Sequence, residues 1–197
     1  MPSKLLVATG NEGKLREFKK VLCGVADVVA PHELSLPLKE VKEGTNYAEN
    51  ALAKARAYRD QFEGLICGED SGLEVDALGT RPGPLSARYG GEKTSYPEKC
   101  RMLLKELKDV PLYERTARFR ATIALIDGKG VKTFEGVLEG WIGFELRGTE
   151  GFGYDPIFIP KGFSQTNAEL GLVIKNRISH RVKAIGKLAE YLRSLKT

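Results

Sequence analysis

The chain has 197 residues, of which 42% are hydrophobic and 29% are charged, and its formal net charge is +5. This length can bury a sizeable core, and the composition is that of a globular protein rather than a disordered or membrane-spanning one. Three scattered cysteines and two histidines argue against a disulfide framework and against a Cys/His zinc site. Because no signal-like or transmembrane-length apolar run occurs, we expect a cytoplasmic protein with no membrane partner.

Hydrophobic periodicity and turn residues predict the elements in chain order. We expect strands at 4–9 and 27–30 around a helix at 14–22, a helix from Thr45 or Asn46 to about 61, strands at 65–67 and 74–78, a helix at 96–107, strands at 116–126, 132–142 and 157–159, and a helix at 181–195. The Asp127-Gly128 turn favours a hairpin between two of these strands. A βαβ start, a hairpin and a final helix together predict an α/β fold around a mixed sheet.

Amphipathic spacing identifies the buried faces of three helices. The apolar stripes are Leu15, Phe18 and Leu22 in the first helix, Met102, Leu103 and Leu107 in the third, and Ile185, Leu188, Leu192 and Leu195 in the last. No repeat or linker interrupts the pattern, so we expect one domain over residues 1–197.

Two adjacent carboxylates, Glu69 and Asp70, follow a short apolar run and precede Ser71-Gly72. A Ser-Gly pair is typical of a turn, so we expect the acids at the end of a strand, where loops can hold a ligand. Carboxylates suit hard cations such as Mg²⁺, which in turn suit phosphates. An acidic pair at a strand end is also common as a plain solvated turn, so this motif needs support from others.

A second motif lies between the first strand and the first helix, at Thr9-Gly10-Asn11-Glu12-Gly13-Lys14. Glycines let the backbone approach a phosphate, the helix start offers free N–H groups, and Lys14 adds a positive charge. A Walker A motif has four residues between its glycines and Ser or Thr after the lysine. Because this loop has neither, it does not indicate a P-loop NTPase.

A third group of residues lies near the C-terminus. Phe152 and Tyr154 stand among glycines just before Asp155, a setting that gives a flat base access to an aromatic ring. Further on, Lys175 precedes Ser179-His180-Arg181 at the start of the last helix. Such donors could bind a phosphate or a base carbonyl, although a capped helix start is the simpler explanation.

These motifs occur in one order along the chain, over residues 4–192, and together resemble the inosine triphosphate pyrophosphatase family, whose members are also called XTP/dITP diphosphatases. The series comprises Thr9–Lys14, Asn50-Ala51 with Lys54-Ala55, Asp70–Leu73, Pro82-Gly83 with Ser86–Arg88, Gly151–Phe158, Ala168-Glu169, Lys175 and Ser179–Arg181. The resemblance implies an elongated, two-lobed α/β fold around a long mixed sheet flanked by helices, with a nucleotide cleft between the lobes. It also implies a homodimer and Mg²⁺-dependent hydrolysis of the purine nucleotides ITP, dITP and XTP to the monophosphate and pyrophosphate.

The resemblance also implies roles for individual residues. It assigns metal binding and catalysis to Asp70, the triphosphate to Thr9, Gly10, Asn11, Glu12, Gly13 and Lys14, a substrate contact to Ser71, and the base pocket to Phe152, Gly153, Tyr154, Asp155, Lys175, His180 and Arg181. Glu69 replaces an aspartate that is usual in the family, and we expect this change to be tolerated. For the second metal ligand, Glu40 is preferred and Glu43 is the alternative.

Two other functions are compatible with parts of the sequence. A Maf-like nucleotide pyrophosphatase has a related fold and prefers pyrimidine or modified nucleotides, but Ser179-His180-Arg181 and the loop Gly151–Asp155 favour the first family. A basic nucleic-acid-binding module would suit the positive charge, yet aromatic and basic residues are not interleaved and no RNP or KH pattern occurs. We therefore expect a nucleotide, not a nucleic acid, as the ligand.

Overall fold

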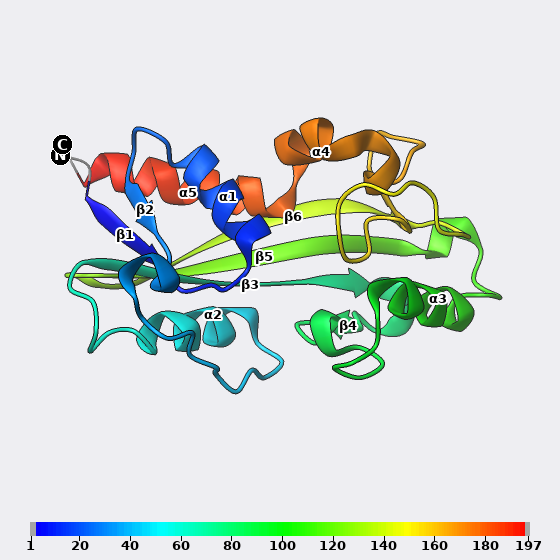
Figure 1. Ribbon diagram of the computed structural model, residues 1–197. Helices are drawn as coiled ribbons and strands as arrows, with labels where there is room; N and C mark the ends of the chain where they lie inside the picture. Colours follow the sequence, from blue (N-terminus) through cyan, green and yellow to red (C-terminus); the bar gives the residue numbers. More distant parts are fainter. Residues whose placement is uncertain (1–2, 196–197) are drawn as a thin grey trace. The chain divides into compact units, whose positions relative to one another are not determined.

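The computed structural model describes residues 3–195 and contains one mixed sheet with helices packed on it (Figure 1). The strands are β1 (Lys4–Val7), β2 (Asp27–Val29), β3 (Leu65–Val75), β4 (Pro82–Gly83), β5 (Thr116–Asp127), β6 (Gly130–Ile142) and β7 (Phe158–Pro160). The helices are α1 (Glu12–Val21), α2 (Tyr47–Arg56), α3 (Tyr96–Glu106), α4 (Asn167–Ile178) and α5 (His180–Ser194), with short 3₁₀ helices at Pro31–Leu34, Asp76–Leu78, Ser86–Arg88 and Leu112–Glu114. The expected α/β class is therefore confirmed.

The strand order in the sheet is β2-β1-β3-β5-β6-β7, and β4 pairs with β3 outside this path. Strand β1 is parallel to both β2 and β3, as expected for a βαβ start, whereas β4 and β7 pair antiparallel with β3 and β6. The chain forms two compact units. Unit 1 comprises the described residues up to Asp70, Ala121–Gly136 and those from His180 onward, and unit 2 comprises Ser71–Arg120 and Val137–Ser179.

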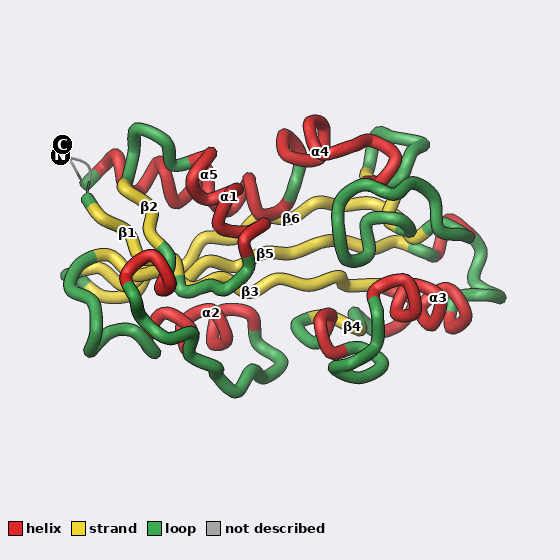
Figure 2. Tube along the Cα trace, viewed as in Figure 1, coloured by secondary structure: helices red, strands yellow, loops and turns green. Residues whose placement is uncertain are grey.

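The main correction concerns β3, because Ser71-Gly72 is not a turn. Strand β3 runs without interruption from Leu65 to Val75, so Glu69 and Asp70 lie inside a strand rather than at its end (Figure 2). Gly72 has a different role from the one expected: a Cβ on it would lie 2.0 Å from the Gly83 carbonyl oxygen. The glycine is needed where β4 approaches β3, and a turn is not required to explain it.

Unit 1 buries apolar side chains on both faces of its part of the sheet. On one face, Leu5 and Val7 of β1 pack with α1 and α5 through the predicted residues Phe18 and Ile185, among others. On the other face, Leu6 packs with Ile66, Ala55 and Tyr58, which belong to β3, α2 and the segment after α2. The alternation along β1 follows from the two-residue period of a strand. Helix α2 begins after Asn46, whose side chain accepts hydrogen bonds from the N–H groups of Ala48 and Glu49, so Asn46 and not Thr45 is the cap.

Unit 2 has a core of its own. Leu73 and Val75 of β3 pack with Leu103 and Leu107 of the α3 segment and with Phe158 of β7, among others. Two predicted core positions are wrong: Met102 in α3 and Leu195 after α5 are 41% and 39% exposed. Helix α4 was not predicted, because Gly171 interrupts it with a backbone φ of 75° and its apolar residues do not form one buried stripe. No helix within residues 3–195 is both long and apolar enough to cross a membrane.

We predict that Gly68→Ala destabilises the protein, because a Cβ at this position would lie 2.1 Å from the Ala51 carbonyl oxygen of α2. Helix α2 would have to move away from β3, and overpacking of this kind typically costs about 1–3 kcal/mol. Urea unfolding measures the loss. Gly128→Ala in the hairpin turn is the matched control, since nothing lies within 4 Å of its Cβ position. Equal unfolding free energies for the two variants would contradict the prediction.

Candidate functional site

Asp70 is a buried carboxylate of β3 that contacts two side chains of α2. Its Oδ1 lies 2.9 Å from the Lys54 Nζ, and its Oδ2 accepts a hydrogen bond of 2.9 Å from the Asn50 amide. Asn50 and Lys54 are four residues apart and therefore face the strand together. The Lys54 ammonium also lies 2.5 Å from the Glu43 carboxylate and donates to the Glu69 carbonyl oxygen. Lys54 is thus a cation held between two carboxylates, one from β3 and one from the loop before α2.

Glu69 is also buried, but its carboxylate contacts residues of α1 and α5. One oxygen lies 2.5 Å from the Lys14 Nζ, and the other accepts a 3.0 Å hydrogen bond from Arg181 Nε. Arg181 in turn donates to Glu17, one turn after Lys14 in α1, at 2.9 Å. Glu69 therefore holds two cations, a role that the sequence did not indicate for it.

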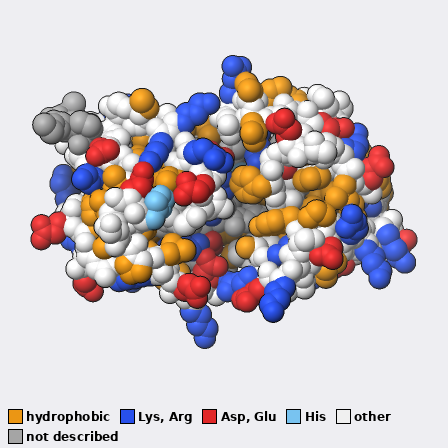
Figure 3. Space-filling view, in the orientation of Figure 1, with side chains coloured by type: hydrophobic (Ala, Val, Ile, Leu, Met, Phe, Trp, Pro, Cys, Tyr) orange, Lys and Arg blue, Asp and Glu red, His pale blue; other side chains and the backbone are white. Residues whose placement is uncertain are grey.

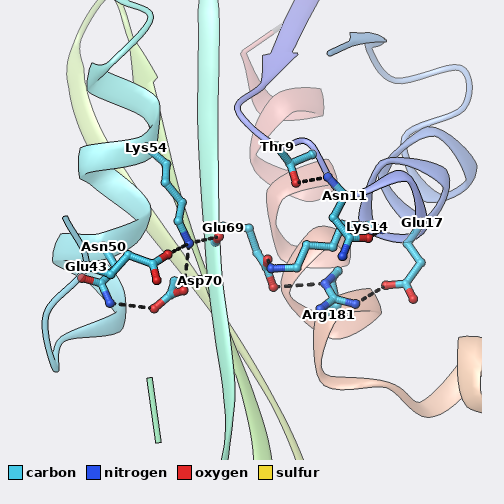
Figure 4. A network of polar contacts seen from close by, with 10 residues as sticks. All are labelled: Thr9, Asn11, Lys14, Glu17, Glu43, Asn50, Lys54, Glu69, Asp70 and Arg181. Atoms are coloured by element: carbon cyan, nitrogen blue, oxygen red, sulfur yellow. Dashed lines mark hydrogen bonds and ion pairs between the residues drawn. The ribbon is translucent and has the colours of Figure 1, made fainter. Parts of the chain in front are cut away.

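Figure 4 shows that Glu69 and Asp70 point to opposite sides of β3. Successive side chains of a strand alternate between its faces, so two adjacent acids in mid-strand must do so. The predicted phosphate ligand Lys14 consequently lies with Glu69, and Lys54 is the lysine that lies against Asp70. The two acids therefore form two acid–base clusters that share one strand.

The electrostatic environment differs between the two acids. Burial raises the pKa of Asp70, and the nearby Lys54 and Asn50 offset only part of that rise. Burial alone would also raise the pKa of Glu69, but Arg181 and Lys14 outweigh it and hold this pKa far below the usual range. Glu69 is therefore a firmly ionised carboxylate, whereas burial favours the neutral form of Asp70.

Burial and neighbouring charges also shift the pKa values of the two lysines, in opposite directions. Burial, helped by the charges of Arg181 and Lys54, lowers the pKa of Lys14 despite the opposing effect of Glu69. Burial also acts to lower the pKa of Lys54, but the Asp70 and Glu43 carboxylates outweigh it and raise that pKa. An added anion near Lys14 would therefore favour its charged form.

The loop from Thr9 to Lys14 is held by its own side chains. Thr9 accepts a hydrogen bond from the Asn11 N–H, and Asn11 caps α1 by accepting one from the Lys14 N–H at 3.0 Å. Thr9 is half-buried, and Gly10, Asn11 and Glu12 are exposed. The Glu12 carboxylate, 3.7 Å from His32, is itself an anion, so only the backbone N–H of this residue is suited to binding one. The helix start is therefore open to a ligand.

A separate cluster in unit 2 contains Phe152, Asp155 and Lys175. Asp155 is 2% exposed, and its Oδ2 accepts a 2.8 Å hydrogen bond from the Phe152 N–H. The same oxygen forms an ion pair with the Lys175 ammonium. The Lys175 Nζ lies 4.1 Å from the centroid of the Phe152 ring, which is 45% exposed. An accessible ring beside a lysine could stack on a flat, electron-rich ligand.

The other predicted site residues have different surroundings. Tyr154 is buried in the core of unit 2, and its hydroxyl donates to the Ser86 carbonyl oxygen, so its side chain has a packing role. Gly153 adopts a φ of 70° and Ser71 is half-buried in β3. His180 and Arg181 are buried in unit 1, where α5 packs so closely that a Cβ on Gly136 would lie 2.0 Å from the His180 carbonyl oxygen. Arg181 thus contacts the Glu69 cluster.

The structure favours Glu43 over Glu40 as a partner of Asp70. Glu43 is half-buried and shares the Lys54 ammonium with Asp70, whereas Glu40 is exposed. Two carboxylates that converge on one cation provide the hard oxygen donors that Mg²⁺ uses together with water and phosphate oxygens. Among residues 3–195, no three His, Cys, Asp or Glu side chains are arranged to hold a metal by themselves. The donor set therefore fits a Mg²⁺ ion that arrives with phosphate ligands.

Four residues of these clusters were given no site role from the sequence: Asn50 and Lys54, which belong to the motif series, Glu17, and Asn167, whose amide donates to Asp155. The i, i+4 spacing of Asn50 and Lys54, and the i, i+3 spacing of Lys14 and Glu17, were visible signals. The contact between Arg181 and Glu69 joins residues 112 positions apart, and no local pattern indicates it.

The fold and these clusters define an α/β protein with acid–base pairs beside an open helix start, a class suited to phosphorylated ligands. Comparison with known proteins identifies it further. Residues 5–191 match the model of the Ham1 family, and the chain belongs to this family. The resemblance inferred from the motifs is thereby confirmed.

Relatives and solved structures agree with this assignment. The chain is 46% identical over 191 residues to a dITP/XTP pyrophosphatase of Caldanaerobacter subterraneus, with 96% of each chain covered. It is 43% identical to the dITP/XTP pyrophosphatase of Bacillus subtilis, covering 95% of this chain and 96% of the relative. The structure of a HAM1 protein from Coxiella burnetii matches with a TM-score of 0.89 at 34% identity, covering 97% of this chain and 98% of that one. The Staphylococcus aureus Ham1 protein gives a TM-score of 0.88 at 35% identity, with 98% and 99% covered.

We predict that Glu69→Gln lowers the free energy of unfolding at pH 7 by about 3–5 kcal/mol, because Lys14 and Arg181 lose a buried counter-ion. The folded protein holds the pKa of Glu69 below its ordinary value of 4.5, so its ion pairs stabilise the fold above that pH and are lost on acidification. The gap between wild type and variant should therefore be largest at neutral pH and shrink below pH 4.5.

Urea unfolding at several pH values measures this gap. Glu33→Gln is the matched control, since the Glu33–Lys19 pair is partly exposed on both sides and exposed pairs contribute little. A constant gap between wild type and Glu69→Gln from pH 7 to pH 3 would overturn the assignment of Glu69 as an ionised buried partner.

Proposed function

We propose that this protein hydrolyses non-standard purine nucleoside triphosphates (ITP, dITP and XTP) to the monophosphate and pyrophosphate. The observation that carries the proposal is the match, over 96% of the chain, to a dITP/XTP pyrophosphatase. The buried Asp70–Lys54–Glu43 cluster and the open start of α1 support it, because they provide acids, lysines and N–H groups for a triphosphate. Removal of such nucleotides would cleanse the nucleotide pool.

We propose Mg²⁺ as the cofactor, with Asp70 and Glu43 as its protein ligands. When bound, Mg²⁺ would neutralise charge that develops on the phosphate oxygens. Lys54 now lies between these two carboxylates, so its ammonium would have to share them or move toward a phosphate. Glu43 replaces the sequence-based preference for Glu40.

The chain's own residues would perform the remaining chemistry. Asp70 has its pKa raised by burial and is placed by Asn50, so it is suited to orient the attacking water and accept its proton. Lys14, whose charge is disfavoured by burial, would bind the triphosphate with the N–H groups at the start of α1. Thr9 and Asn11 fix the shape of this loop, and Ser71 would contact the substrate.

The residues Phe152, Gly153, Asp155 and Lys175 of unit 2 are proposed to bind the base. Phe152 is exposed enough to stack on a purine, and Lys175 lies against its ring. Hypoxanthine and xanthine carry a carbonyl at C6 where adenine has an amino group, so a donor directed at C6 discriminates between them. His180 and Arg181 remain candidates for this donor, but Arg181 would have to release Glu69 or Glu17 to reach a base.

Membership of the Ham1 family favours this function over a Maf-like pyrophosphatase and over a nucleic-acid-binding module. The face drawn in Figure 3 intermixes basic and acidic side chains, whereas nucleic-acid binding favours a continuous basic patch. We further propose that residues 1–197 act as one catalytic domain, that the protein works as a homodimer, and that it is cytoplasmic.

The proposed function is tested with a panel of ITP, dITP, XTP, ATP and GTP in the presence of Mg²⁺. We expect pyrophosphate release from the first three, and Asp70→Asn should reduce it about 10²–10⁴-fold while the melting temperature stays close to that of wild type. Orthophosphate as the product, or equal rates with ATP, would contradict the proposal. Near-normal turnover by Asp70→Asn would assign the catalytic role to another residue.

We predict that Glu43→Gln raises the Mg²⁺ concentration needed for half-maximal ITP hydrolysis, because one charged oxygen ligand is lost. Glu40→Gln is the matched control from the same loop and should leave the Mg²⁺ dependence unchanged. Titration of activity with Mg²⁺ at saturating ITP distinguishes the two. A shift confined to Glu40→Gln would restore the sequence-based preference.

A further inference from the structure

Asp155 is the acceptor on which the unit 2 cluster depends. Its carboxylate is 2% exposed, so its hydrogen bonds must come from protein donors and not from bulk water. Oδ2 accepts from the Phe152 N–H and from Lys175, while Oδ1 accepts a 3.1 Å hydrogen bond from the Asn167 amide. Among these contacts, only that from Asn167 reaches Oδ1, so this amide determines how the second oxygen is held.

Asn167 is itself fixed by the start of α4. Thr166 caps the helix by accepting a hydrogen bond from the Glu169 N–H, and its hydroxyl donates to the Arg147 carbonyl oxygen at 2.8 Å. The next residue, Ala168, donates its N–H to the Asp155 carbonyl oxygen. The start of α4 is therefore bonded to Asp155 through both backbone and side chain. These bonds leave the Asn167 amide little freedom to move.

Packing alone does not explain an amide at this position. Asn167 is 1% exposed, and its Oδ1 has no hydrogen-bond partner among residues 3–195. An apolar side chain of similar size would fill the space without leaving an acceptor unpaired. Because an ionised carboxylate only accepts hydrogen bonds, Nδ2 must face Asp155 and Oδ1 must face away. The bond to Asp155 is thus the gain that offsets the unpaired oxygen.

We propose that Asn167 is a positioning residue for recognition of the purine base, an inference that rests on the proposed function. Asn167 holds Asp155, Asp155 holds the Lys175 ammonium, and that ammonium lies 4.1 Å from the centre of the exposed Phe152 ring. Asp155 also fixes the Phe152 backbone through its N–H. Loss of the Asn167 donor therefore loosens the stacking ring and its neighbouring cation together.

This positioning role affects the base and not the phosphates. Asn167, Asp155, Lys175 and Phe152 all belong to unit 2, whereas Lys14, Lys54 and Asp70 belong to unit 1. A ligand without a base should therefore bind equally well with or without the amide. A purely structural role would instead lower thermal stability without a selective effect on ligands that carry a base.

The experiment compares Asn167→Leu and the isosteric Asn167→Asp with wild type by calorimetric titration with inosine monophosphate and, separately, with tripolyphosphate. We expect both variants to bind inosine monophosphate about tenfold more weakly, the loss of one hydrogen bond to a charged group, and to bind tripolyphosphate as wild type does. The KM for ITP should rise by a similar factor with little change in kcat. Two variants are used so that the result does not depend on the folding of either one.

Thr122→Val is the matched control. Thr122 is fully buried in β5, and its hydroxyl oxygen also has no partner within residues 3–195, but it belongs to unit 1. We expect its affinities to equal those of wild type. Unchanged inosine monophosphate affinity in both Asn167 variants, or an equal loss for tripolyphosphate, would overturn the inference. Failure of wild type to bind inosine monophosphate and to cleave ITP would instead overturn the proposed function.

Discussion

The structure depends on the burial of two adjacent carboxylates within one strand. Glu69 and Asp70 are 3% and 4% exposed, and a buried charge without a partner would be strongly destabilising. Because they lie in mid-strand, they face opposite sides of β3 and cannot share one counter-ion cluster. Helices on both sides must therefore supply cations. Glycines make this approach possible, since Gly68 lets α2 lie against β3 and Gly136 lets α5 lie against β6.

This arrangement keeps the lysines of the site paired before any ligand is present. Lys14 has Glu69, and Lys54 has Asp70 and Glu43. The proposed ligand, a triphosphate with Mg²⁺, would bring both signs of charge, so it would satisfy the carboxylates and the lysines at the same time. Binding then exchanges ion pairs instead of creating charges in a dry site, which reduces the desolvation penalty. The internal ion pairs would thus keep the buried lysines and carboxylates paired until the ligand replaces them.

The sequence predicted the elements whose signals are local, and failed where distant contacts decide. Helix α1, the hairpin of β5 and β6, and α5 have clear periodicity or turn residues. Strand β3 was divided at Ser71-Gly72 because a glycine required by the approach of β4 resembles a turn glycine. Helix α4 was not predicted because Gly171 interrupts it. Within the site, the acids and the phosphate loop could be predicted from their motifs, but the contact of Arg181 with Glu69 could not, since it depends on the packing of α5.

The clusters of the two units divide the proposed reaction in a way that follows from their chemistry. The clusters of unit 1 contain charged groups suited to phosphates and metal, which are common to all nucleoside triphosphates. The cluster of unit 2 contains an exposed ring and a lysine held by Asp155 and Asn167, which respond to the base. In the proposed function, stacking on Phe152 is blind to the group at C6, so the choice between purines would rest on a donor such as His180 or Arg181. If Arg181 is that donor, the choice of base is coupled to the Glu69 cluster, because the same guanidinium donates to both Glu69 and Glu17.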